Sequence, residues 1–387
     1  MKIKIMKPHI NNCIKIGIFI LLIKTFWGNI VLIPYTGAID SVLTVLACAF
    51  FLLEILYQKY SINTLAIYAV VVILSLFSAS KTGSFGLMST VITCLVLREE
   101  NLVDVITYMY QVEKILFSIV FITAIIMSLF GGPSLTMNVN GMERFAFGFT
   151  HPNVFSAIAF NIIMMWVWIN FNRMTPKRIL TLILVELLLF YFTRTRTTLI
   201  VEIIMDILIV IPFSIGMLSK IAMVVTPTMA FITYVLAALF MRGNPFAIMM
   251  NTVLSSRVKL TAYALEKFGP TIFGNNLQGF RVNWEANWGL NDFTFDNLYS
   301  SFFSSVGIIW LIGCTVLFFL VARKKDRKFC VYIILWALYG MTEVHGSNCY
   351  ICFPILVVTT LFTKGTGKKQ YGVNKQVGNG EGIIKKS

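Results

Sequence analysis

The chain has 387 residues, of which 57% are hydrophobic and only 13% are charged. Soluble domains carry roughly 25% charged residues, so this composition excludes an ordinary water-soluble domain. Lysine and arginine outnumber aspartate and glutamate by 32 to 17, which gives a formal net charge of +15. We interpret this excess as basic loops beside anionic lipid, and we expect no nucleic acid partner.

Apolar runs follow one another along the chain. A hydrocarbon core about 30 Å thick needs roughly 20 apolar residues per helix, whereas a membrane β-barrel would show alternating apolar and polar strands. The sequence therefore predicts an all-α, polytopic integral membrane protein of about 12 transmembrane helices, within a range of roughly 10 to 12. The expected spans are 14–34, 39–57, 62–80, 84–97, 115–130, 151–171, 178–193, 197–213, 219–240, 299–321, 330–345 and 346–363.

The distribution of basic residues predicts the orientation. With the N-terminus in the cytoplasm, 22 of the 32 lysines and arginines fall on the cytoplasmic side, in agreement with the positive-inside rule. This map predicts a cytoplasmic tail at 1–13, a transmembrane domain at 14–363 and a basic cytoplasmic tail at 364–387. Both termini are then cytoplasmic, and the bilayer itself is the first expected partner.

Two segments on the outer side are too long to be simple turns. They are 131–150 and the much larger 241–298, which lies between the ninth and tenth spans. Long loops in a compact chain tend to be functional. Within the larger loop, Ser255 to Phe268 is expected to form a helix at the membrane surface, ended by Gly269-Pro270.

Nine basic residues fall on the outer side, against the rule, and six of them are arginines. Arginine presents a planar fork of donors that matches phosphate oxygens two at a time. An outward cluster of these arginines would therefore suit an anionic, phosphorylated ligand, although each could instead reach lipid phosphates at the interface. The cluster comprises Arg144, Arg194, Arg196, Arg257 and Arg281.

Titratable groups at the outer ends of spans are candidates for proton transfer. His151 opens the sixth expected span, where Pro152 suits a first helical turn, so a capping role and a chemical role are both open. Glu343 and His345 lie at the outer end of the eleventh. A carboxylate there is a candidate general base, and the alternative is a solvated loop.

Acidic residues inside the expected spans keep a transport function open. They are Glu54, Glu186, Glu202 and Asp206, the last two on one helical face. Acids in membrane helices are rare and usually pair or line a path. The chain has no phosphate-binding loop, dinucleotide fingerprint or zinc-protease motif, so neither a metal nor a cofactor is expected.

Several segments together resemble the O-antigen polymerase and ligase superfamily, membrane glycosyltransferases that assemble bacterial surface polysaccharides. The segments are Gly148-Phe149-Thr150-His151-Pro152-Asn153, Thr193-Arg194-Thr195-Arg196-Thr197-Thr198, Ser256-Arg257 with the stretch to Pro270 and Phe273-Gly274-Asn275-Asn276, and Phe295-Asp296-Asn297-Leu298-Tyr299. The resemblance implies metal-independent chain transfer on the outer face of the bacterial cytoplasmic membrane, from an undecaprenyl-pyrophosphate-linked oligosaccharide. It also implies a flippase and a chain-length regulator as partner proteins.

One departure from the family separates its two branches. Ligases have a histidine just before the asparagine that corresponds to Asn297, and this chain has Asp296 there. The resemblance therefore favours a polymerase of O-antigen, capsule or exopolysaccharide type over a ligase. It implies that Arg196 and Arg257 bind the pyrophosphate, with Arg194 as a reserve. For acceptor positioning or proton removal it leaves His151, Asp296, Glu343 and His345. A flippase for lipid-linked oligosaccharide and a secondary transporter remain alternatives.

Overall fold

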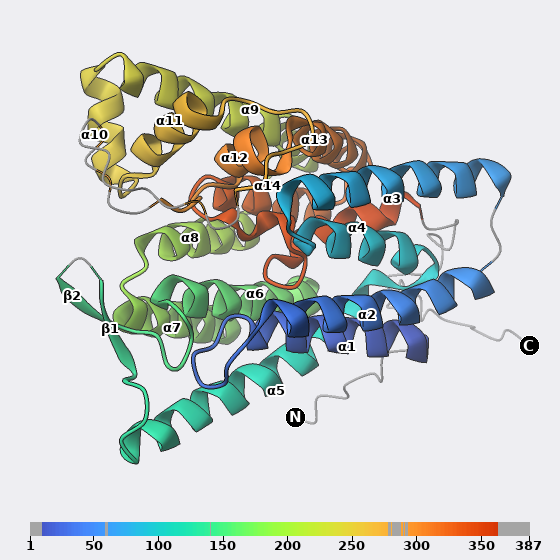
Figure 1. Ribbon diagram of the computed structural model, residues 1–387, viewed down its shortest axis with the longest axis horizontal. Helices are drawn as coiled ribbons and strands as arrows, with labels where there is room; N and C mark the ends of the chain where they lie inside the picture. Colours follow the sequence, from blue (N-terminus) through green and yellow to red (C-terminus); the bar gives the residue numbers. More distant parts are fainter. Residues whose placement is uncertain are drawn as a thin grey trace, which may run out of the picture.

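The computed structural model describes residues 10–58, 61–139, 141–277, 280, 288, 290 and 293–362, so most of the two expected tails lies outside the described residues. Most helices run side by side across the molecule (Figure 1). The α-helices are α1 (Asn12–Trp27), α2 (Gly37–Tyr57), α3 (Ile62–Thr82), α4 (Gly86–Val96), α5 (Leu102–Leu129), α6 (Pro152–Asn170), α7 (Pro176–Thr193), α8 (Arg196–Val210), α9 (Ile215–Met241), α10 (Pro245–Val253), α11 (Arg257–Phe268), α12 (Leu298–Ser301), α13 (Ile308–Ala322) and α14 (Arg327–Gly340).

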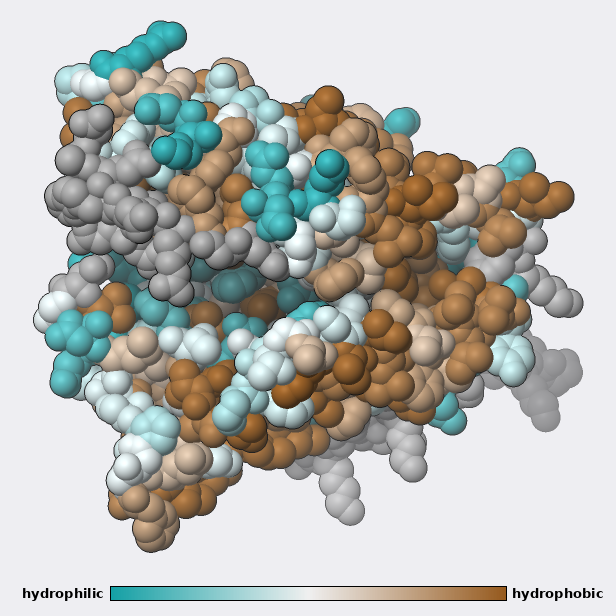
Figure 2. Space-filling model, viewed as in Figure 1, coloured by the Kyte–Doolittle hydropathy of each residue, from teal (hydrophilic) through white to brown (hydrophobic). Residues whose placement is uncertain are grey.

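Apolar helices confirm an all-α, membrane-embedded protein. In the part of the chain that the structure describes, five helices are long and apolar enough to cross a bilayer: α2, α3, α5, α6 with its following turn, and α9. Their outward faces are apolar, as Leu56 and Ile62 illustrate with exposed fractions of 72% and 86%. Hydrophobic side chains accordingly cover much of the surface in Figure 2. The remaining expected spans correspond to shorter elements, so the count of twelve stays a prediction.

The tenth expected span, 299–321, is not one continuous helix. α12 is followed by a π-helical turn over Phe302–Val306, and α13 begins only after Gly307, whose φ is 111°. The interruption leaves backbone groups free to bond residues of the segment 241–298. Thr271 donates its backbone N–H to the carbonyl oxygen of Phe303, and the N–H of Ile308 is donated to the carbonyl oxygen of Thr271. Backbone hydrogen bonds to residues distant in sequence therefore replace helical hydrogen bonds at this break.

The last expected span, 346–363, is also irregular. Two 3-10 helices, at Val344–Ser347 and Phe353–Leu361, take the place of an α-helix. Pro354 stands in the first turn of the second one, and the backbone N–H of Phe353 finds a side-chain acceptor in Asn161 of α6 at 2.9 Å. Local chain irregularity at this depth is tolerated because the segment is buried within protein.

The described parts of the two long segments 131–150 and 241–298 lie at the same end of the helix bundle (Figure 1). The first contains an antiparallel hairpin of β1 (Thr136–Val139) and β2 (Met142–Phe145), in which Met137 pairs with Arg144. The second contains α10 and α11. The helix expected from Ser255 to Phe268 is confirmed by α11, although it begins two residues later, at Arg257. It packs against α9 and is followed by Gly269, whose φ is 65°.

α14 is the helix at the centre of the fold. Eleven of its fourteen residues are buried, and it packs against α8, α9 and α13. A helix of this length spans about 21 Å. It begins at Arg327 and ends at Gly340, shortly before Glu343, so it connects two opposite ends of the molecule. The candidate functional site lies at the second of these ends.

Candidate functional site

Arg144 joins three segments at the end of the bundle where the long loops lie. From β2, its Nε donates to the carbonyl oxygen of Thr193 at 2.6 Å, and its Nη2 donates to Oδ1 of Asn153 at 2.7 Å and to Oγ1 of Thr195 at 2.9 Å. The side chain is half-buried, and burial lowers its pKa from the ordinary arginine value. Because that ordinary value is far above neutral pH, the guanidinium keeps its positive charge.

The segment before α6 is held in place by both backbone and aromatic contacts. Phe149 pairs with Ile30 in an isolated antiparallel bridge, and its ring lies 5.5 Å from that of Phe155. Gly148 has a φ of 82°, and a Cβ at this position would lie 2.8 Å from Cβ of Ala124. Only glycine fits such a position without strain. These contacts determine where α6 starts.

His151 caps the N-terminus of α6. Its Nδ1 accepts the backbone N–H of Asn153 at 3.1 Å, which confirms the capping role. A ring nitrogen that accepts a hydrogen bond carries no proton, so the proton of the neutral ring lies on Nε2. Burial and the positive charge of Arg144 lower the pKa of His151, which favours this neutral form. His151 is therefore equipped to donate a hydrogen bond rather than to remove a proton.

Arg257 and Glu343 form a buried ion pair, with 3.3 Å between Nη2 and Oε1. Nε of Arg257 also donates to the carbonyl oxygens of Thr342 at 2.7 Å and Asp296 at 3.2 Å. One guanidinium thus connects the start of α11, the segment before α12 and the segment after α14.

The backbone before Arg257 adopts an unusual conformation. Ser255 and Ser256 have φ values of 51° and 69°, a region that non-glycine residues rarely adopt. The N–H of Ser256 donates to the carbonyl oxygen of Asn251 at 2.8 Å and so helps to hold the turn. Each such residue costs roughly 1–3 kcal/mol. The strained turn changes the direction of the chain between α10 and α11. It thereby places the Arg257 side chain in the cluster.

Glu343 lies beyond the end of α14 and is only 5% exposed. Its Oε1 also accepts a hydrogen bond from Oγ1 of Thr197 at 3.3 Å. Burial raises the pKa of Glu343 to about 7, and this effect outweighs the opposing influence of Arg257. Arg144 also interacts electrostatically with Glu343 and Arg257. The two buried or half-buried arginines and Glu343 therefore belong to one charged cluster.

Asp296 offers a more accessible carboxylate. It is half-exposed, and its Oδ1 accepts a hydrogen bond from Oγ1 of Thr294 at 3.2 Å. Its charge acts on both Glu343 and His151, so it faces the same cluster. The neighbouring Asn297 caps α12 and donates to the carbonyl oxygen of Met341 at 2.8 Å. This cap holds Asp296 close to the end of α14.

The remaining predicted site residues lie outside these contacts. Arg194, at the end of α7, is exposed, and its guanidinium lies 5.1 Å from the ring centre of Tyr191. Arg196 is exposed at the start of α8 and makes no ion pair or side-chain hydrogen bond with any described residue. His345 lies in the 3-10 helix after Glu343 without such a bond to the cluster, and Arg281 lies outside the described residues.

The polar partners in the cluster were not singled out from the sequence. They are Asn153, Thr195, Thr197 and Asn297, which bond Arg144, Glu343 or a helix end. Each stands within a segment that carried the family resemblance, at the start of a helix. A search for hydroxyl and amide groups at the first helical turns on this side would have found them.

The surface at this end of the helix bundle is hollowed. Figure 2 shows a recess near α8, between α11 and α12 on one side and α6 and α7 on the other, with hydrophilic residues on its floor. The chain matches no protein family model, no curated protein and no solved structure. A function must therefore be inferred from the residues of this cluster.

Proposed function

We propose that the chain is a membrane glycosyltransferase that joins lipid-linked oligosaccharide repeat units into a polysaccharide. The observation that supports it best is the convergence of Arg144 and Arg257 with Glu343 and the accessible Asp296 at one end of the bundle. Transfer from a lipid pyrophosphate needs cations for the leaving group and a carboxylate for the acceptor. The cluster contains both.

The chemistry is a substitution at the anomeric carbon of the donor glycan. A hydroxyl oxygen of the acceptor forms the new bond, while the bond from that carbon to the phosphate oxygen breaks. The lipid pyrophosphate leaves with the bonding electrons, and the hydroxyl proton passes to a carboxylate. Arginines stabilise the growing negative charge because they offer paired donors to phosphate oxygens.

The contacts divide the roles among the predicted residues. Asp296 is the better proton acceptor because its carboxylate is half-exposed, whereas Glu343 is buried and engaged with Arg257. Glu343 is thus a positioning residue. Arg196 is exposed and has no described side-chain partner, yet it stands between Thr195 and Thr197, which touch the cluster. We assign the pyrophosphate to Arg144, Arg196 and Arg257.

The decisive test combines deletion of the gene with polymer synthesis by the purified protein. The gene is deleted in its bacterial host, and surface polysaccharide is sized by electrophoresis. A polymerase leaves one attached repeat unit, a flippase leaves no surface repeat units, and a ligase leaves polymer on its lipid carrier. Purified protein is then incubated with an undecaprenyl-pyrophosphate-linked repeat unit. Elongated glycan supports the proposal, and an absence of elongation with a repeat unit from the same host contradicts it.

Transport is the second function that a specific observation favours. Glu186 of α7 interacts with Glu202 and Asp206 of α8, and Oε1 of Glu202 is buried without a hydrogen-bond partner among the described residues. Acids of this kind can line a transport path. Removal of these acids separates the functions, because a polymerase keeps its product and a carrier loses its flux.

A further inference from the structure

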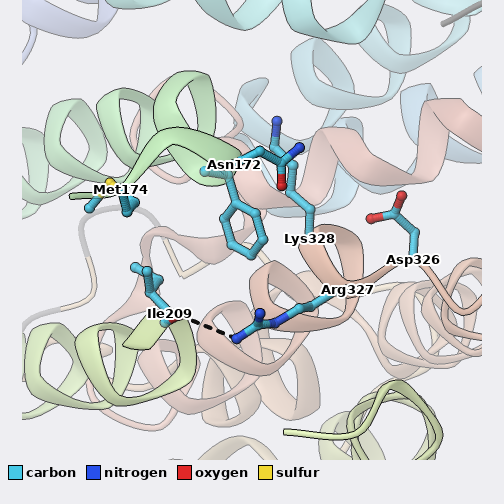
Figure 3. A pocket seen from close by; sticks show the side chains of 7 residues that line it. Asn172, Met174, Ile209, Asp326, Arg327 and Lys328 are labelled. Carbon is cyan, nitrogen blue, oxygen red and sulfur yellow. Dashed lines mark hydrogen bonds between the residues drawn. The ribbon is translucent and has the colours of Figure 1, made fainter. Parts of the chain in front are cut away.

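A second polar region lies at the opposite end of the same helices. α6 and α8 begin at the candidate site, and their far ends meet the start of α14 in a pocket of about 380 Å³. Helices of this length place the pocket about 20 Å from the candidate site. The pocket is lined by Phe171, Asn172, Met174, Ile209, Asp326, Arg327 and Lys328 (Figure 3).

Lys328 is a half-buried cation that lies over an aromatic ring. Its Nζ lies 4.0 Å from the ring centre of Trp168, and it makes no hydrogen bond or ion pair with any residue that the structure describes. Asp326 accepts the backbone N–H of Phe329 at 3.1 Å, and its negative charge also acts on Lys328. Burial lowers the pKa of Lys328 to about 8. A bound anion would compensate the cost of placing this charge in the pocket.

Arg327 adds donors to the same pocket. Its Nη2 donates to the carbonyl oxygens of Leu208, Ile209 and Ile211 at 3.1, 3.2 and 2.8 Å, and so binds the end of α8. Its Nε is buried and has no acceptor among the described residues. In Figure 3 the Arg327 side chain reaches toward Ile209 and that of Lys328 extends toward Asn172. Donors and positive charge thus exceed acceptors at this pocket.

We propose that this pocket binds the phosphate group of an anionic molecule, with Lys328 as its ionic partner. The apolar side of the pocket, formed by Phe171, Met174 and Ile209, would contact the adjoining carbon atoms. The surrounding surface attracts anions because exposed basic residues gather at this end. They are Arg173, Arg323, Lys324 and Lys325. The phosphate belongs either to a phospholipid headgroup or to a small soluble anion.

Binding to purified full-length protein tests this inference without any activity measurement. Phosphatidylglycerol, phosphatidylcholine and inorganic phosphate are titrated separately, with native mass spectrometry for the lipids and calorimetry for phosphate. Preferred binding of phosphatidylglycerol identifies a lipid headgroup site. Binding of inorganic phosphate that displaces this lipid identifies a site for soluble anions. If neither binds the wild-type protein, the proposal is wrong.

Lys328→Gln is the critical variant, and Lys177→Gln is its control because Lys177 is an exposed lysine at the same end. We expect Lys328→Gln to weaken binding about tenfold, Lys328→Arg to retain it and the control to remain within about twofold. Equal binding by Lys328→Gln and wild type would overturn the proposal. Should Lys328→Gln not fold, ligand must protect Lys328 of the wild-type protein from amine methylation, and unprotected labelling contradicts the site.

Discussion

Arg257 and Glu343 stand 86 positions apart in the chain, yet their side chains form an ion pair 3.3 Å long with both groups buried. A buried pair of this kind is weak evidence for stability by itself, because desolvation offsets the attraction. The ion pair matters here because it fixes the position of the Arg257 side chain. The guanidinium is held between the segments that precede α12 and follow α14, where the accessible carboxylate of Asp296 lies.

Replacing Glu343 tests whether activity depends on the ion pair with Arg257. We expect Glu343→Gln to lower polymer formation roughly 100-fold, since an amide cannot balance the Arg257 charge. The variant should unfold at nearly the wild-type temperature, because burial raises the pKa of Glu343 to about 7 and so favours the neutral acid that the amide resembles. Polysaccharide sizing and thermal unfolding in detergent measure the two effects. A stable, fully active Glu343→Gln protein would remove the ion pair from the mechanism.

Arg196 allows function to be tested apart from folding. Because the exposed side chain makes no ion pair or side-chain hydrogen bond with a described residue, Arg196→Lys should leave the melting temperature unchanged. Lysine keeps the charge but lacks the fork, so we expect long polymer to disappear while single lipid-linked repeat units still reach the outer face. Arg242→Lys, at the exposed end of α9, is the control. Unchanged chain length in the Arg196 variant would exclude it from the site.

The pH dependence of polymerisation should report on Glu343. Because its pKa is raised to about 7, the carboxyl is neutral below that pH and pairs with Arg257 only above it. We therefore expect the rate measured in vitro to rise about tenfold from pH 6 to pH 8. A Glu343→Gln variant that retains the same rise would show that another group titrates.

The strained turn before α11 predicts opposite effects of two substitutions. Ser256→Gly should keep the fold, because glycine adopts a φ of 69° readily. Ser256→Val should cost roughly 1–2 kcal/mol, because a β-branched residue fits this region poorly. Thermal unfolding and polymer length should change together if the turn places Arg257. A Val variant as stable as the Gly variant would contradict the argument from strain.

The acidic group between α7 and α8 separates polymerisation from transport. We expect the double variant Glu202→Gln, Asp206→Asn to keep wild-type polymer length, because these residues lie within α8, beyond the first-turn residue that touches the cluster. Polysaccharide sizing in the complemented deletion strain gives the answer. Loss of surface repeat units in this variant would instead favour a carrier.

Much of the architecture follows from the sequence alone. Runs of apolar residues require helices in hydrocarbon because backbone groups must bond internally there. Local signals predict a helix that ends at Phe268 and a proline, Pro152, in the first turn of the helix at His151. Both are confirmed, although α11 begins at Arg257 and not at Ser255. The break at Gly307 was not predictable, because apolar composition continues through it and its backbone partners come from residue 271 onward.

The candidate site was also predictable from the sequence only in part. From the sequence we expected arginines and histidines near the ends of helices, since charge is costly inside a membrane span. Only the tertiary structure decided that Arg144 and Arg257 turn inward while Arg194 and Arg196 remain exposed. Inward burial requires partners to offset desolvation, and those partners, Thr193, Thr195 and Glu343, come from distant parts of the chain.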